Sequence, residues 1–121
     1  MIGVGCDIIE IKRIAKAVEN AHFVERVYTE QEATYCQSRG KQAPASFAAR
    51  FAAKEAVLKA FGTGLRGGEI KEIEVVLDDL GKPSIRLSGY HKALAERLGV
   101  KQICVSLSHG QEQAIAYVVM E

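Results

Sequence analysis

The longest helical pattern in the chain is PASFAARFAAKEAVLKAF, residues 44–61. Its apolar side chains recur at the three- and four-residue spacing of an α-helix. Pro44 stands at the start, where a helix tolerates proline, and the glycines of Gly62-Thr63-Gly64 follow the end. The stretch therefore predicts one long helix, against which the flanking elements can pack.

The segment before this helix predicts one strand and several short helices. Apolar residues alternate over the first residues, with Ile2, Val4, Cys6 and Ile8 on one face and Gly3, Gly5, Asp7 and Ile9 on the other. Thr29 and Glu32 have the spacing of a capping box, which marks a helix start. The predicted elements are a strand over 2–9 and short helices over 10–18, 22–27 and 30–37.

The segment after the long helix predicts two hairpins separated by a helix. The turn at 78–82 joins two strands, and the polar residues 109–113 join two more. The predicted elements are strands over 70–77 and 83–87, a helix over 88–98, and strands over 101–108 and 114–120. This order predicts an α+β fold, a single domain over 1–121, with a largely antiparallel sheet packed against one long helix and several short ones.

Composition supports a globular protein. The chain has 121 residues, of which 48% are hydrophobic and 26% charged, which excludes a disordered or fibrous protein. No apolar stretch is long and uncharged enough to span a membrane, and the N-terminus lacks the basic start of a signal peptide. The three cysteines have neither disulfide nor zinc spacing, so we expect small core residues in a reducing cytoplasm.

The charge distribution predicts a small anionic ligand. The net charge is only +1, but residues 39–67 hold six basic side chains and one acid. Such a cluster raises the local concentration of anions, although surface lysines can also cluster by chance. The near-neutral balance, the absence of Trp and the lack of a basic run with interleaved aromatics disfavour nucleic acid. A compact phosphate fits better.

Two carboxylates are candidate metal ligands. Asp7 shares its strand face with two glycines, which leaves room for a ligand, although it can also cap the next helix. Glu55 lies at the edge of the apolar arc of the long helix. As an alternative to metal binding, Glu55 could form an ordinary surface ion pair with Lys59, one helical turn later. Together, Asp7 and Glu55 would suit Mg²⁺, which takes few protein ligands.

Other polar residues have weaker patterns. Lys54 lies in the middle of the apolar arc, so either its stem reaches to solvent or this face borders a charged cleft. Arg50, Lys54 and Lys59 would supply positive charge for phosphates. His109 closes a strand, a position more typical of a structural histidine. His22 and His91 are expected on the surface, and Ser106 and Ser108 on the polar face of a strand.

Four motifs, in this order, resemble those of the 4′-phosphopantetheinyl transferases, most closely their short bacterial holo-acyl-carrier-protein synthase subgroup. They are IGVGCDIIEI over 2–11, RFAAKEAVLKAFGTG over 50–64, GKP over 81–83 and VSLSH over 105–109. The resemblance extends over essentially the whole chain. It implies the fold of that family and transfer of the phosphopantetheine arm of coenzyme A to a serine of an apo-acyl carrier protein.

The resemblance also implies roles for individual residues. Asp7 and Glu55 would bind Mg²⁺, and Glu55 and Lys59 would be the catalytic residues. Arg13 and Arg26 would face the acidic helix of the carrier protein. The residues expected around coenzyme A are Arg50, Lys54, Lys59, Gly62, Gly64, Lys82, Pro83 and His109. The family further implies a homotrimer whose sites are shared between subunits.

Two positions depart from the family pattern. Cys6 stands where another residue is usual, on the strand face opposite Asp7, so we expect no effect on metal binding. The loop over 37–43 varies in the family, which leaves Arg39 and Lys41 without an assigned role. Two other functions fit the residues alone: a nucleotide-binding module without catalysis, which paired acids disfavour, and a metal-dependent phosphohydrolase, which would need water in place of the serine.

Overall fold

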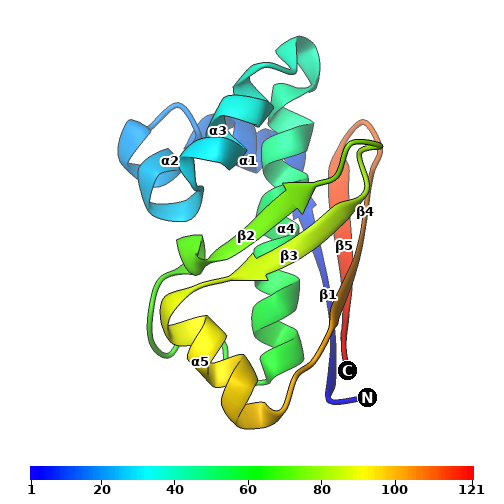
Figure 1. Ribbon diagram of the computed structural model, residues 1–121. Coiled ribbons are helices and arrows are strands. Elements are labelled where there is room, and N and C mark those ends of the chain that lie inside the picture. Colours follow the sequence, from blue (N-terminus) through cyan, green and yellow to red (C-terminus); the bar gives the residue numbers. More distant parts are fainter.

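The computed structural model describes residues 1–121 and arranges two antiparallel sheets around one long helix (Figure 1). The elements are β1 (Gly3–Glu10), α1 (Ile11–Ala17), α2 (Ala21–Val27), α3 (Glu30–Gln37), α4 (Ala43–Phe61), β2 (Ile73–Leu77), β3 (Pro83–Leu87), α5 (Gly89–Leu98), β4 (Ile103–His109) and β5 (Gln113–Met120). All the predicted strands and helices are confirmed. Residues 70–72 form a 3₁₀ turn rather than the start of β2.

The predicted antiparallel sheet is divided in two. One sheet has the strand order β1-β5-β4, and the other is the β2–β3 hairpin. β3 contacts β4 but does not bond to it, because the hairpin runs obliquely and diverges from β4 toward α5 (Figure 1). α4 packs along β1 and β5 and also contacts β2, so it connects the two sheets.

Two glycines let α4 approach β1 unusually closely. A Cβ atom at Gly3 would collide with the carbonyl oxygen of Ala60, and one at Gly5 with that of Ala56. From the sequence, we expected the space above these glycines to admit a ligand, but the backbone of α4 occupies it. Asp7, two residues further along the same face, is thereby held beside α4.

The helix termini explain where the elements begin and end. The predicted capping box is present at α3, where the Thr29 hydroxyl accepts from the Glu32 amide and the Glu32 carboxylate accepts from the Thr29 amide. α4 has Pro44 in its first turn and ends at Gly62 in the left-handed conformation, with φ of 79°. These local signals account for the accuracy of the predicted boundaries.

The outer face of the three-stranded sheet carries apolar side chains in contact with solvent. The exposed apolar residues are Ile2, just before β1, Val4 and Ile8 on β1, and Ile115 and Tyr117 on β5, each 39–55% exposed. Cys6 and Cys104 also lie on this face, so the prediction of three core cysteines holds only for Cys36. No helix combines the length and the apolar character needed to cross a membrane.

Candidate functional site

Asp7, Glu55 and Lys59 form a charged cluster at the surface between β1 and α4. The Lys59 ammonium donates to Asp7 Oδ1 at 3.0 Å and to the Cys6 carbonyl, also at 3.0 Å. The Asp7 side chain is only 15% exposed. The alternative pairing of Lys59 with Glu55 along the helix is not formed, because Lys59 reaches across to the strand instead.

The two carboxylates of this cluster repel each other. The pKa of Glu55 is raised, chiefly by burial and then by the negative charge of Asp7, while Lys59 and Arg13 act in the opposite direction. The hydrogen bond and the charge of Asp7 raise the pKa of Lys59. A cation with a higher charge than an ammonium would relieve this repulsion further.

The donor set of the cluster fits Mg²⁺. Two carboxylates meet here without a third acid, histidine or cysteine, and no larger group of such ligands occurs in the chain. Mg²⁺ is commonly held by one or two carboxylates and completes its octahedron with water and substrate phosphate. Zinc, which prefers three or four nitrogen and sulfur ligands, does not fit.

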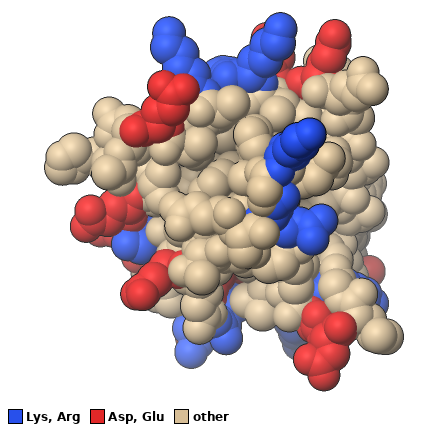
Figure 2. Space-filling view, turned by 90° about the horizontal axis from the view of Figure 1, so that it is seen from above, with Lys and Arg blue, Asp and Glu red and all other residues tan.

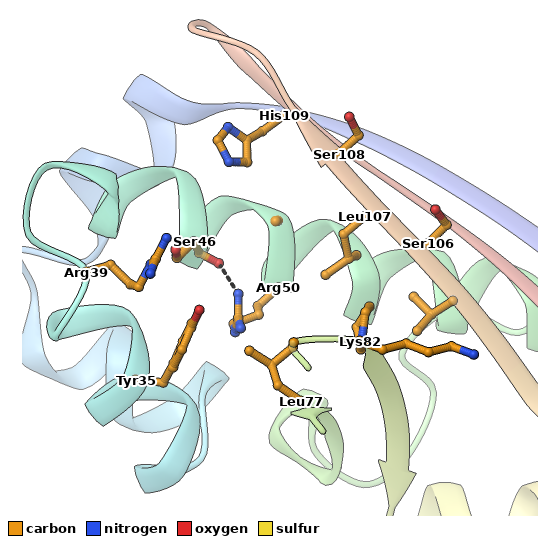
Figure 3. A pocket seen from close by; sticks show the side chains of 14 residues that line it. Tyr35, Arg39, Ser46, Arg50, Leu77, Lys82, Ser106, Leu107, Ser108 and His109 are labelled. Atoms are coloured by element: carbon orange, nitrogen blue, oxygen red, sulfur yellow. Dashed lines mark hydrogen bonds between the residues drawn. The ribbon is translucent and has the colours of Figure 1, made fainter. Parts of the chain in front are cut away.

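A separate cavity of about 440 Å³ lies on the other side of α4. α3, α4, the β2–β3 turn and β4 form its walls, and Figure 3 shows Arg39 and Tyr35 on one wall and His109 on another. Four of the residues predicted to bind coenzyme A line this cavity: Arg50, Lys82, Pro83 and His109. The Lys82 side chain extends away from Arg50 (Figure 3). Sequence reasoning missed Tyr35 and Ser46.

Arg50 forms the most buried polar part of this cavity. Its side chain donates to the Ser46 carbonyl at 3.2 Å and lies over the Tyr35 ring, with the guanidinium carbon 4.7 Å from the ring centroid. The residue is 5% exposed and has no carboxylate partner. A buried cation without an acid at the floor of a cavity favours an anionic ligand.

The positive charge of the site comes from separate side chains rather than from a broad patch. On the face seen from above, small groups of Lys and Arg side chains alternate with Asp and Glu around the rim, and no patch of one sign covers the face (Figure 2). Arg39, for which the family pattern left no role, also lines the cavity. The basic excess over 39–67 was the signal that pointed to it.

Lys54 is not at the site. Its ammonium is fully enclosed, where it donates to Glu32 Oε1 at 2.8 Å and to the Ile73 carbonyl. Burial lowers the pKa of Lys54, while Glu32 opposes this effect. The prediction that Lys54 contacts coenzyme A is therefore wrong, and so is the suggestion that its stem reaches solvent.

α4 separates the carboxylate cluster from the cavity. At 100° per residue, Glu55 and Lys59 lie about 140° and 180° around the helix from Arg50. Asp7 belongs to β1 and His109 to β4, which are opposite edges of the same sheet. Gly62 and Gly64 lie beyond the C-terminal end of α4, and neither lines the cavity. The predicted residues thus form two half-sites on opposite flanks of one helix.

Comparisons with known proteins agree with these motifs. The family model of the 4′-phosphopantetheinyl transferase superfamily matches residues 3–118. The holo-[acyl-carrier-protein] synthase of Ruminiclostridium cellulolyticum is 51% identical, with 96% of this chain and 89% of the relative covered. The crystal structure of the Neisseria meningitidis enzyme of the same name matches with a TM-score of 0.90 at 35% identity, covering 100% and 99% of the two chains. That of the Bacillus anthracis enzyme, in complex with CoA (3′,5′-ADP), gives 0.81 at 38% identity, covering 98% and 95%.

Proposed function

Because the chain belongs to the 4′-phosphopantetheinyl transferase superfamily, we propose that it is a holo-[acyl-carrier-protein] synthase. It transfers the 4′-phosphopantetheine arm of coenzyme A to a serine of apo-acyl carrier protein and releases adenosine 3′,5′-bisphosphate. The observation that carries the proposal is the meeting of Asp7 and Glu55, from two motifs far apart in the sequence, beside Lys59. The catalytic domain comprises residues 1–121, and the three free thiols favour a cytoplasmic location.

Asp7 and Glu55 would hold Mg²⁺ in this enzyme. When bound, the ion supplies positive charge to the pyrophosphate of coenzyme A and to the leaving phosphate. Lys59 adds a mobile positive charge next to the same phosphates. Glu55 is also a candidate base for the proton of the attacking serine.

Replacing Glu55 with glutamine is expected to raise the melting temperature of the metal-free protein at pH 8. A carboxyl with a raised pKa in the folded state holds its proton more tightly than in the unfolded chain. Stability is therefore lost as the pH rises through that raised pKa, and the loss disappears below the unfolded value of about 4.3. Thermal unfolding of both proteins at pH 8 and at pH 4 measures the difference.

Added Mg²⁺ provides the second part of this test. It should stabilise the wild type at pH 8, because a ligand that binds only the folded state raises its stability, and should have little effect on Glu55→Gln. Equal stabilisation of the two proteins by Mg²⁺ would exclude Glu55 as a metal ligand.

The two half-sites support an active site shared between copies of the chain. Coenzyme A phosphates held by Arg50, Lys82 and His109 in one subunit would meet Asp7 and Glu55 of another, since α4 separates these groups within one subunit. The exposed apolar face of the β1-β5-β4 sheet offers the surface for such contacts. We infer a homotrimer, with Gly62, Gly64 and Pro83 at the edges of each shared site.

Replacing Ile115 with glutamate is expected to break the trimer. A charge buried at an apolar interface is costly, so light scattering should give the 13.2 kDa mass of one chain instead of about three times that value. The variant should stay folded by circular dichroism but lose most transfer activity. Leu98→Glu, which adds the same charge to an exposed leucine on α5, is the control. An Ile115→Glu protein of unchanged mass would argue against this face as the interface.

The carrier protein would dock on the first two helices. Arg13 on α1 and Arg26 on α2 are both exposed, and Arg13 lies near enough to Glu55 to influence its pKa. A basic surface next to the catalytic carboxylates would orient an acidic carrier helix, so that its serine faces the site.

The decisive experiment is intact-protein mass spectrometry of apo-acyl carrier protein incubated with this protein, coenzyme A and Mg²⁺. A single phosphopantetheine adduct that disappears with EDTA supports the transferase. Consumption of coenzyme A without carrier protein would favour a phosphohydrolase. Binding of coenzyme A with no reaction on any of a panel of carriers would favour the non-catalytic binding module.

A further inference from the structure

The glycine-rich segment that follows α4, here called the 62–68 loop, has little to hold its shape. It reads GTGLRGG, and three of its glycines adopt left-handed φ values of 63–79°. Leu65 is 54% exposed and contributes nothing to the core. The Arg66 side chain donates to the Thr63 carbonyl at 3.0 Å inside the loop. The path of the loop therefore depends on the structures at its two ends.

The far end of the loop is packed against two side chains from outside it. A Cβ atom at Gly67 would lie 2.7 Å from Cε2 of the Tyr90 ring. One at Gly68 would lie 2.5 Å from Glu72 Oε1 and 2.6 Å from the Tyr90 Cβ. The loop backbone therefore rests directly on Glu72 and Tyr90, with no side chain between them.

A buried histidine holds Glu72 in place. His91 is 1% exposed, so the prediction of a surface residue is wrong. Its Nδ1 lies 2.7 Å from Glu72 Oε1, and its backbone amide donates to the same oxygen at 3.3 Å. Ser88, the N-cap residue of α5, makes no side-chain capping bond, so Glu72 caps this helix from outside.

The imidazole has no other polar partner. His91 Nε2 is buried without a hydrogen bond, and the ring lies beside Phe61, the last residue of α4, with centroids 6.2 Å apart. A leucine could fill this space without an unsatisfied nitrogen, so packing does not explain the histidine. Burial acts to raise the pKa of Glu72, but the hydrogen bonds from His91 outweigh it and hold this pKa below its ordinary value.

We propose that Glu72 and His91 are positioning residues that set the conformation of the 62–68 loop, and through it the affinity for the phosphates of coenzyme A. This rests on the proposed function, which places Gly62 and Gly64 at the edge of the coenzyme A site. The pair does not touch the reacting atoms. Its loss should weaken coenzyme A binding rather than slow the transfer of bound substrate.

Three variants of α5 test the positioning role. His91→Leu removes the bond to Glu72 and is expected to raise the KM for coenzyme A about tenfold, with kcat within about twofold. His91→Asn places an amide nitrogen where Nδ1 was and should restore most of the affinity. Leu94→Ala, a core position on the same helix, loses stability but leaves the bonds between His91 and Glu72 in place, so it should keep the wild-type KM at a temperature where all variants are folded.

The result is separable from the transferase proposal, because coenzyme A binding to all four proteins is also measured by calorimetry. Weaker binding by His91→Leu alone supports the positioning role. If the wild type also modifies no carrier protein, that second result counts only against the transferase proposal. Wild-type affinity in His91→Leu, an equal loss in Leu94→Ala, or no recovery in His91→Asn would overturn the positioning role. If His91→Leu does not fold, Glu72→Gln replaces it in the test. This variant keeps the size of the side chain and is expected to weaken coenzyme A binding, and unchanged affinity would overturn the positioning role.

Discussion

Replacing Asp7 with asparagine is expected to lower the kcat of transfer by about 10²- to 10³-fold, the usual effect of removing one prearranged electrostatic contact. The change keeps the shape of the side chain and removes only its charge. Mg²⁺ would lose one of two carboxylate ligands, and the pyrophosphate of coenzyme A would lose the charge that this ion supplies. Steady-state rates over a range of Mg²⁺ concentrations measure both the fall in kcat and the weaker dependence on metal.

The Asp7→Asn protein should remain folded. Its ion pair with Lys59 involves an ammonium side chain that is 55% exposed, and such pairs contribute about 0–1 kcal/mol. Losing the charge also removes the repulsion that, after burial, contributes to the raised pKa of Glu55. Glu10→Gln, an exposed acid at the end of the same strand, is the control and should keep full activity. Asp7→Asn with the wild-type rate and metal dependence would show that Asp7 is not a metal ligand.

Replacing Lys54 with methionine is expected to destabilise the protein by about 3–5 kcal/mol, because it leaves the buried Glu32 carboxylate without its cation. Glu32 also accepts from the Thr29 amide at 2.9 Å and the Val75 amide at 2.8 Å, so this pair ties α3, α4 and β2 together. For a chain of this length the loss corresponds to a fall in melting temperature of roughly 10–20 °C.

Lys59→Met is the matched control for Lys54→Met. The two substitutions are chemically the same and lie five residues apart on one helix. Lys59 is exposed and bonded to Asp7, so its replacement should leave the melting temperature nearly unchanged and lower kcat. Below its melting temperature, Lys54→Met should retain most transfer activity. A stable Lys54→Met protein that no longer binds coenzyme A would contradict the structural role and show that Lys54 belongs to the active site.

The elements of the fold could be predicted because their signals are local. The alternation of residues 2–9, the Thr29–Glu32 capping box and the glycine after Phe61 depend on neighbours within one or two turns of chain. The pairing of Asp7 with Glu55 is not local, and the sequence indicated it only through the residue types and motifs at these two positions, without any geometry. Each of these requires knowledge only of the chain close by or of the resemblance to a family.

What lies opposite a side chain could not be predicted in this way. A helical wheel places Lys54 and Lys59 on their faces, but it cannot show that Glu32 covers the first or that Asp7 competes with Glu55 for the second. His91 is buried because Glu72 arrives from a distant turn.

The sequence by itself therefore determined the order of the elements, the two candidate metal ligands and the family. Tertiary structure decided which charges are buried, that the sheet is divided in two, and that α4 separates the two half-sites. The physical reason is that propensity and capping act over a few residues. The free energy of a charge, in contrast, depends on desolvation and on partners that are distant in the chain.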